Sequence, residues 1–252
     1  MFIINSTWTI LAGREAVALE ALGELARQVQ AVEPDTWMYL IHVPNPDPNI
    51  RAFPPAGSGT VTFFEGFRDE AAFRKHVEGA SLTGFIAKYG ELFLNMYGAS
   101  TPFVLAQGLE TASGFIRPEA AEPTLFTVIA RWNIQPGHEA AARRALHRYV
   151  VDVHRVEPGT FMYTANTPVP AGQSPSFPTS ALNQLVFNSG WKDHAAFVEH
   201  TQAAPYRDLL EQHGRLFLQT NGATTSNQPY MTTSVLTRIA GFFRPEAFFN
   251  RP

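Results

Sequence analysis

Apolar residues recur at helical spacing in two long stretches of the chain. Between positions 18 and 32 they stand three or four residues apart, and the same spacing returns between positions 142 and 156. This period places them on one face of an amphipathic helix. Both stretches end at a Glu-Pro pair, and the residue before a proline disfavours the helical conformation. The pattern therefore predicts one helix in each half, ending near Val32 and Val156.

Short segments rich in β-branched and aromatic residues surround these helices and are typical of strands. The expected strands are 2–10, about 36–43, one ending near Phe67 and about 101–116 in the first half, and 125–134, about 160–167, one ending near Trp191 and about 231–243 in the second. A second, interrupted helical segment is expected after Asp69 and after Asp193, because aspartate side chains cap helix N-termini. Each half therefore has the order strand–helix–strand–strand–helix–strand.

The second half of the chain repeats the first. Residues 2–98 align with residues 126–222 without a gap, and 33 of the 97 paired positions are identical. The sequence Val-Glu-Pro-Asp-Thr-Trp-Met-Tyr at 32–39, for example, returns as Val-Glu-Pro-Gly-Thr-Phe-Met-Tyr at 156–163. Self-similarity over this length indicates two copies of one domain.

Two such copies predict an α+β protein with two tandem ferredoxin-like (βαββαβ) domains. We expect domain 1 at 1–117, a proline-containing linker at 118–124 and domain 2 at 125–247. A four-stranded sheet with helices on one face leaves its other face uncovered, and stacking the copies sheet to sheet would cover both. Residues 1–124 carry a formal charge of −6 and residues 125–252 one of +3. Opposite charges suit halves that associate, although independent drift after duplication explains them equally well.

Composition removes several classes of chemistry. The 252 residues include no cysteine, which excludes disulfides, Cys-ligated zinc and thiol nucleophiles. A formal charge of −3 gives no reason to expect a nucleic-acid partner. No apolar run reaches the roughly 18–20 residues of a membrane span, and the apolar start aligns with an internal strand rather than reading as a signal peptide. We therefore expect a soluble, cytoplasmic protein that does not contact membranes.

Two motifs in the second half carry a family resemblance. They are Glu157-Pro-Gly-Thr after the first helix and Trp191-Lys-Asp-His-Ala-Ala-Phe-Val-Glu-His200 at the start of the second helical segment. Together with the element order they resemble the antibiotic biosynthesis monooxygenase family of dimeric α/β barrels. The resemblance covers about 125–243 and, through the internal alignment, extends more weakly to the first half. Because single-copy relatives dimerise through their sheets, it implies that the two domains stack as an intramolecular pseudo-dimer, a pseudo-dimeric α/β barrel, with or without further homodimerisation.

The resemblance implies chemistry on small aromatic molecules. The family includes cofactor-independent oxygenases of aromatic polyketides, quinol oxygenases, haem-degrading enzymes and members of no known activity. The haem branch has an Asn on the first strand and a Trp and a His on the second helix. At the aligned positions this chain has Ala130, His200 and Leu210 in the second half and Ser6, His76 and Ile86 in the first, so neither half keeps the triad, which argues against haem degradation. We expect a monooxygenase that uses O2 and a small aromatic or quinol-type substrate, with no cofactor and no metal. A non-catalytic binding or stress-response module of the same fold, and an isomerase or lyase acting on an aromatic-derived metabolite, are the alternatives.

His76 and His200 are the histidines that occupy equivalent positions in the two copies. Histidine is the natural base near neutral pH, and each lies three residues after a phenylalanine, on the helix face toward the sheet. A helix histidine bonded to a backbone carbonyl is the alternative interpretation. Asn188 is a polar residue inside an apolar strand, where it would either orient the substrate or face water at an edge.

Aromatic residues supply the remaining candidates, each of which core packing would also explain. The expected substrate-binding residues are Trp191, Tyr163, Phe197 and Trp132, with His76 and Tyr39 as a second site. The first half has Phe67 in place of Trp191 and Phe64 in place of Asn188. These apolar replacements predict a filled pocket in the first half. We therefore expect the main site in the second half, with His200 and Asn188 as its catalytic residues.

Overall fold

The computed structural model describes residues 1–47, 49–50, 52–55, 57, 59–95, 101–122, 125–170, 180–219, 229–245 and 247. The first half contains β1 (Phe2–Thr9), α1 (Glu15–Val32), β2 (Thr36–Pro44), β3 (Thr60–Phe67), α2 (Glu70–Glu78), α3 (Ala80–Tyr89), η1 (Gly90–Leu92), β4 (Leu105–Ile116) and η2 (Pro118–Ala121). The second half contains β5 (Phe126–Asn133), α4 (Glu139–Val156), β6 (Thr160–Pro168), β7 (Gln184–Trp191), α5 (His194–Gln202), α6 (Ala204–His213), η3 (Gly214–Leu216) and β8 (Thr232–Phe243). In the described part of the chain, no helix is both long and apolar enough to cross a membrane.

These elements agree closely with those expected from the sequence, and the α+β class is confirmed. Asp69 caps α2 by accepting a hydrogen bond from the backbone N–H of Ala72 at 2.9 Å, and Asp193 caps α5 in the same way through Ala196. The interruption of each second helical segment is the extended backbone between α2 and α3 and between α5 and α6. In the expected linker, η2 occupies 118–121, and residues 123 and 124 lie outside the described residues.

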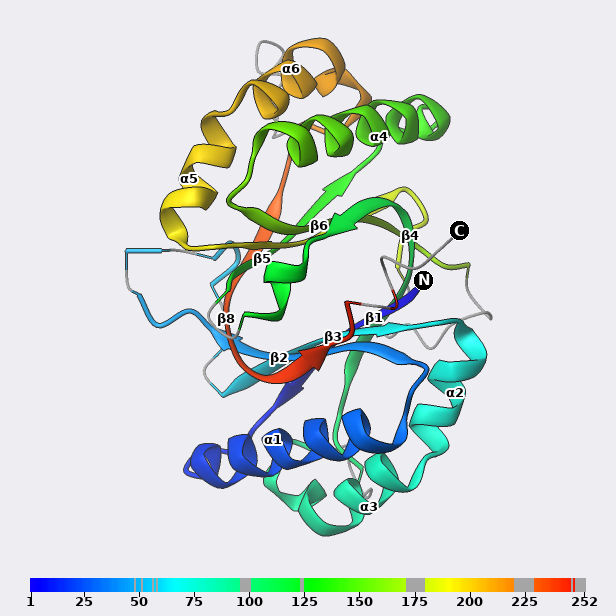
Figure 1. The fold of residues 1–252 in the computed structure, drawn as a ribbon, viewed down its shortest axis with the longest axis vertical. Helices are drawn as coiled ribbons and strands as arrows, with labels where there is room; N and C mark the ends of the chain where they lie inside the picture. The colour runs from blue at the N-terminus through cyan, green and yellow to red at the C-terminus, as the bar shows by residue number, and fades with distance from the viewer. Residues whose placement is uncertain are drawn as a thin grey trace.

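The eight strands form one closed barrel in the order β1-β3-β2-β8-β5-β7-β6-β4 (Figure 1). The sequence predicted two ferredoxin-like domains stacked sheet to sheet as a pseudo-dimeric α/β barrel, and in the structure the strands of both halves close into a single barrel. The physical reason is the length of the fourth strands, which have 12 residues where β1 and β5 have eight. The first part of β4 pairs with β1 and its last part with β6, while β8 pairs with β5 and then β2. Each half therefore completes the sheet of the other.

Helices cover the outside of the barrel, α1–α3 over the first half and α4–α6 over the second (Figure 1). Successive residues of a strand point to opposite faces of the sheet. Apolar clusters consequently form between each helical layer and the sheet, and another fills the barrel interior. Residues from both halves make up the interior cluster, including Ile3, Leu40, Ile129 and Val186. Burial of this shared core holds the two halves together.

Candidate active site

A cavity of about 650 Å³ lies between the sheet and the helices of the first half. This volume is within the range of roughly 300–1,000 Å³ that is usual for small-molecule sites. Strand residues from the sheet form one wall, and residues of α2 and α3 form the other. The lining residues are Ile4, Ser6, Trp8, Tyr39, Glu65, Glu70, Phe73, Arg74, His76, Val77, Glu78, Leu82, Ile86, Thr101, Val104 and Ala106.

Two carboxylates flank the buried imidazole of His76. His76 Nδ1 donates to Glu33 Oε2 at 2.7 Å, and His76 Nε2 lies 3.8 Å from Glu65 Oε2. Ser6 Oγ donates to the other oxygen of Glu65 at 3.2 Å. These four residues form what we call the first-half cluster. Because both His76 and Glu65 line the cavity, the cluster can exchange a proton with a bound molecule.

Local sequence places each member of this cluster. Glu33 is the residue at which α1 ends before Pro34, and its carboxylate also accepts from Thr36 Oγ1 at 3.0 Å. His76 lies on the inward face of the short helix α2. The register of the sheet places Glu65 opposite both Tyr39 on β2 and Ile4 on β1. With Ser6 on β1, four separate segments are thus needed to assemble the cluster.

Burial and neighbouring charges shift the pKa values of these groups. Burial raises the pKa of Glu65, although the His76 charge and the Ser6 hydrogen bond oppose the shift. Burial by itself would lower the pKa of His76, but the hydrogen bond to Glu33 and the charges of Glu65 and Glu33 outweigh it and raise the pKa. Burial, followed by the charges of the two carboxylates, raises the pKa of the Tyr39 phenol well above its ordinary range. Tyr39 therefore stays neutral beside the cavity.

The equivalent position in the second half has protein partners on both nitrogens of the imidazole. His200 Nδ1 donates to Glu157 Oε2 at 2.7 Å, so that Nε2 accepts from the Tyr149 hydroxyl at 3.2 Å. Tyr149 in turn bonds the hydroxyl of Tyr163 at 3.1 Å. Trp191 packs on His200 with ring centroids 5.2 Å apart. This arrangement satisfies His200 within the protein.

Substitutions between the copies explain why the two imidazoles differ. Tyr149 stands where the first half has Leu25, and Tyr206 stands where it has Leu82. The ring of Tyr206 lies 5.8 Å from that of His200. These larger side chains occupy the helix side of the second-half sheet, whereas leucines leave room in the first half. The expectation of a filled first-half pocket is wrong, because helix residues rather than Phe64 and Phe67 decide the space.

The structure separates the two residues expected to be catalytic. His200 on α5 lies against Tyr163 and Trp191 on the outer face of the sheet. Asn188 on β7 faces the barrel interior and exchanges hydrogen bonds with Asn5 at 2.8 and 2.9 Å. Of the expected binding residues, Tyr163 lies 5.2 Å from His200, and Phe197 lies 4.9 Å from Trp191, between ring centroids.

The remaining expected residues divide between the core and the cavity. Trp132 packs in the apolar core of the second half, 4.9 Å from Phe187. The expected second-site residues, His76 and Tyr39, both line the first-half cavity.

Sequence reasoning missed the carboxylates of the site. Glu33 and Glu157 belong to the recurring Glu-Pro motif, which was interpreted only as a helix stop. Their recurrence together with His76 and His200 was the available signal. Glu65 was detectable as a carboxylate within the apolar run of β3, a position where an unpaired charge is costly.

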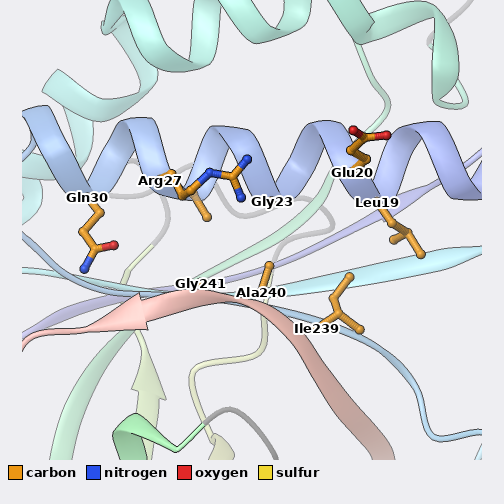
Figure 2. Close-up of a pocket in the computed structure, with 9 residues that line it drawn as sticks. Leu19, Glu20, Gly23, Arg27, Gln30, Ile239, Ala240 and Gly241 are labelled. Atoms are coloured by element: carbon orange, nitrogen blue, oxygen red, sulfur yellow. The ribbon is translucent and has the colours of Figure 1, made fainter.

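A smaller hollow of about 360 Å³ lies outside the barrel between α1 and β8 (Figure 2). Leu19 of α1 points toward Ile239 and Ala240 of β8 there, whereas the carboxylate of Glu20 points away from that strand. The lining residues are Leu19, Glu20, Gly23, Ala26, Arg27, Gln30, Ile239, Ala240 and Gly241. Since this lining includes no histidine, the cavity of the first half, which His76 lines, is the better candidate for acid–base chemistry.

Comparisons with known proteins give a family match within the second half. Residues 125–212 match the model of the antibiotic biosynthesis monooxygenase family. A search of curated proteins returns no significant match. The structure resembles those of candidate monooxygenases from Fusobacterium nucleatum (TM-score 0.70, 12% identity, 94% of this chain and 91% of that one) and Lactobacillus acidophilus (TM-score 0.70, 12% identity, 94% and 93%).

An anthrone oxidase-like protein is also similar, with a TM-score of 0.53 and 12% identity over 93% of this chain and 90% of that one. At these identities the structural likeness demonstrates a shared fold. The family match is therefore the more specific finding: over residues 125–212, the chain matches the antibiotic biosynthesis monooxygenase family.

Proposed function

We propose that the protein is a cofactor-independent monooxygenase that oxidises a small aromatic or quinol-type substrate with O2 in the first-half cavity. The observation that carries the proposal is the placement of His76 and Glu65 together in the wall of a cavity of about 650 Å³. Two further observations support it: the family match of the second half, and the aromatic residues that line the same cavity as the acid–base groups.

Such a reaction makes three demands on the protein: an apolar slot, an acceptor for the phenolic proton and donors for the developing oxyanion. Glu65 and His76 are the acceptors at the cavity wall. Trp8 also lines the cavity, and its buried indole N–H has no hydrogen-bond partner among the described residues. In this proposal that N–H is the donor to the oxyanion. The substrate itself supplies two electrons and two protons, so one oxygen atom enters the product and the other leaves as water.

In this proposal each chain has one working site. The second half completes the barrel around the first, and its own histidine is held by Tyr149 and Glu157. An isomerase or lyase is the second candidate, favoured by the carboxylate–imidazole pair, because acid–base chemistry of that kind does not require oxygen.

Oxygen uptake with a panel of hydroquinones and anthrone-like phenols tests the proposal. We expect His76→Asn to lower kcat/KM by about 100-fold or more, the usual contribution of a general base. His200→Asn serves as the matched variant and should change kcat/KM less than about threefold, the structural effect of a variant away from the chemistry. A large loss of kcat/KM in His200→Asn with little change in His76→Asn would instead locate the site in the second half.

Two further observations separate the alternatives. Product formed from the same panel without oxygen would favour the isomerase or lyase. Saturable binding with neither oxygen uptake nor product would instead indicate a non-catalytic binding module.

A further inference from the structure

The inner wall of the first-half cavity holds more carboxylates than cations. His76 lies between Glu33, 2.7 Å from Nδ1, and Glu65, 3.8 Å from Nε2. An imidazole carries at most one positive charge and each carboxylate one negative charge. The three groups become net positive only when all of them are protonated, which requires acid. Near neutral pH these three groups therefore present no net positive charge to an anionic ligand.

Charges at the rim do not change this balance. Arg74 is the one arginine or lysine among the described residues that line the cavity. Its guanidinium donates to Glu70 Oε1 through Nη2 at 2.7 Å and through Nε at 3.2 Å, so its charge is already paired. Glu78 adds a further carboxylate to the lining. The Tyr39 phenol stays neutral because burial raises its pKa.

The remaining walls suit a planar, uncharged ring. Trp8, Tyr39 and Phe73 contribute aromatic surfaces, and Leu82 and Ile86 contribute aliphatic ones. Aromatic faces attract both apolar rings and cations. A buried carboxylate among such faces stabilises a hydroxyl or ammonium donor far better than a second anion.

The carboxylate and its hydroxyl partner occur as a pair in the first half alone. Glu65 is replaced by Ser189 in the second half, and Ser6 is replaced by Ala130. The glutamate–histidine pair at the end of the first helix is common to both halves. Glu65 is therefore not needed to hold the imidazole in this fold, and its role belongs to the open cavity.

We propose that Glu65 sets the charge selectivity of this cavity, an inference that rests on the proposed function for the location of the substrate. The cavity takes an aromatic ligand whose hydroxyl or ammonium group donates to Glu65, and it rejects aromatic ligands that carry a carboxylate. Glu65 acts here as a specificity-determining residue for the substrate class.

Calorimetric titration of the full chain without oxygen tests this selectivity independently of turnover. The probes are three matched ligands: naphthol, a hydroxynaphthoate and an aminomethyl naphthol. We expect the wild type to bind the hydroxynaphthoate at least about tenfold more weakly than naphthol. Glu65→Gln should reduce that difference to less than about threefold and weaken binding of the aminomethyl naphthol. Glu157→Gln, the same change at a His-paired carboxylate of the second half, should leave the order of affinities unchanged.

Glu65→Ser introduces the residue type that the second half has at this place, and it provides a second variant should Glu65→Gln fold poorly. Equal affinity of the wild type for naphthol and hydroxynaphthoate, an unchanged preference in a folded Glu65 variant, or no binding of any probe would each overturn the inference. Selective binding without oxygen uptake would defeat the proposed function and leave the selectivity intact. Equal oxygen uptake with naphthol and with hydroxynaphthoate would contradict the selectivity but not the proposed function.

Discussion

The side-chain amides of Asn5 and Asn188 exchange two hydrogen bonds, of 2.8 and 2.9 Å, although 183 residues separate them in the chain. Asn5 lies on β1 and Asn188 on β7, two strands that are not neighbours in the barrel. Both side chains are buried, so the pair crosses the barrel interior and links the two halves. A satisfied pair of this kind specifies one alignment of the halves, because any other leaves amides unpaired in the core.

The losses of stability caused by the two single replacements in this pair should not add up in the double variant. Asn188→Leu leaves the Asn5 amide buried without its partner, which we expect to cost about 1–3 kcal/mol of unfolding free energy. Asn5→Leu should cost a similar amount, and the double variant should lose clearly less than the sum. Urea unfolding of the four proteins measures the cycle. Strict additivity would contradict the interaction, and Gln28→Leu on the exposed face of α1 is the surface control.

His42 should make the protein sensitive to acid. Burial of this residue, followed by the Arg238 charge, lowers its pKa to about 3, against the opposing effect of the Thr62 backbone. The unfolded chain takes up the proton near the ordinary value of 6.5, so stability declines as the pH falls from 6.5 toward 3. His42→Leu should remove a slope of up to about 1.4 kcal/mol per pH unit.

Urea unfolding between about pH 7 and about pH 4 measures this slope, across the window in which the unfolded chain is protonated first. His138→Leu replaces an exposed histidine and should retain the acid sensitivity of the wild type. An unchanged slope in His42→Leu would show that another group carries the effect.

Leu82→Tyr should close the first-half cavity. The second half has Tyr206 at this place, so the fold accommodates a phenol ring there. We expect ligand affinity or kcat/KM to fall at least about tenfold, while the free energy of unfolding changes by less than about 1.5 kcal/mol. Leu94→Tyr adds the same ring at an exposed position and should change neither quantity. Full activity in folded Leu82→Tyr would exclude this cavity as the site.

Glu33→Gln should move the pH profile of the reaction. Its carboxylate raises the pKa of His76 through the hydrogen bond at 2.7 Å, so the amide variant should have a lower His76 pKa. Since a proton acceptor works when it is deprotonated, the rising limb of kcat/KM should shift toward acid by about one pH unit. Glu157→Gln should leave that limb in place. A profile unmoved by Glu33→Gln would mean that His76 does not titrate in the reaction.

The same shift has a consequence for stability. A histidine whose pKa is raised by folding contributes stability that is complete below its unfolded pKa and is lost as the pH rises through the folded value. Glu33→Gln should therefore reduce stability more at mildly acidic pH than at alkaline pH, the opposite direction from His42.

The sequence by itself determined the elements of this protein and their repetition. Helices that end at Glu33-Pro34 and Glu157-Pro158, and helices that begin after Asp69 and Asp193, follow from interactions within a few residues. The 33 identities between the copies gave the order of elements in both halves at once. Local rules suffice for such features, because both partners of each interaction lie in one short segment.

Only the tertiary structure revealed the cavity of the first half and decided which face of the sheet each residue occupies. Asn188 was expected to be catalytic together with His200. Successive side chains of a strand point to opposite faces of the sheet, however, and the Asn188 side chain lies inside the barrel. The space in the cavity depends on whether leucine or tyrosine projects from two helices toward the sheet. The first-half cluster brings together Ser6, Glu33, Glu65 and His76 from four segments. Contacts between distant segments depend on how strands pair and how side chains fill the space between layers, which is a property of the packed molecule rather than of any one segment.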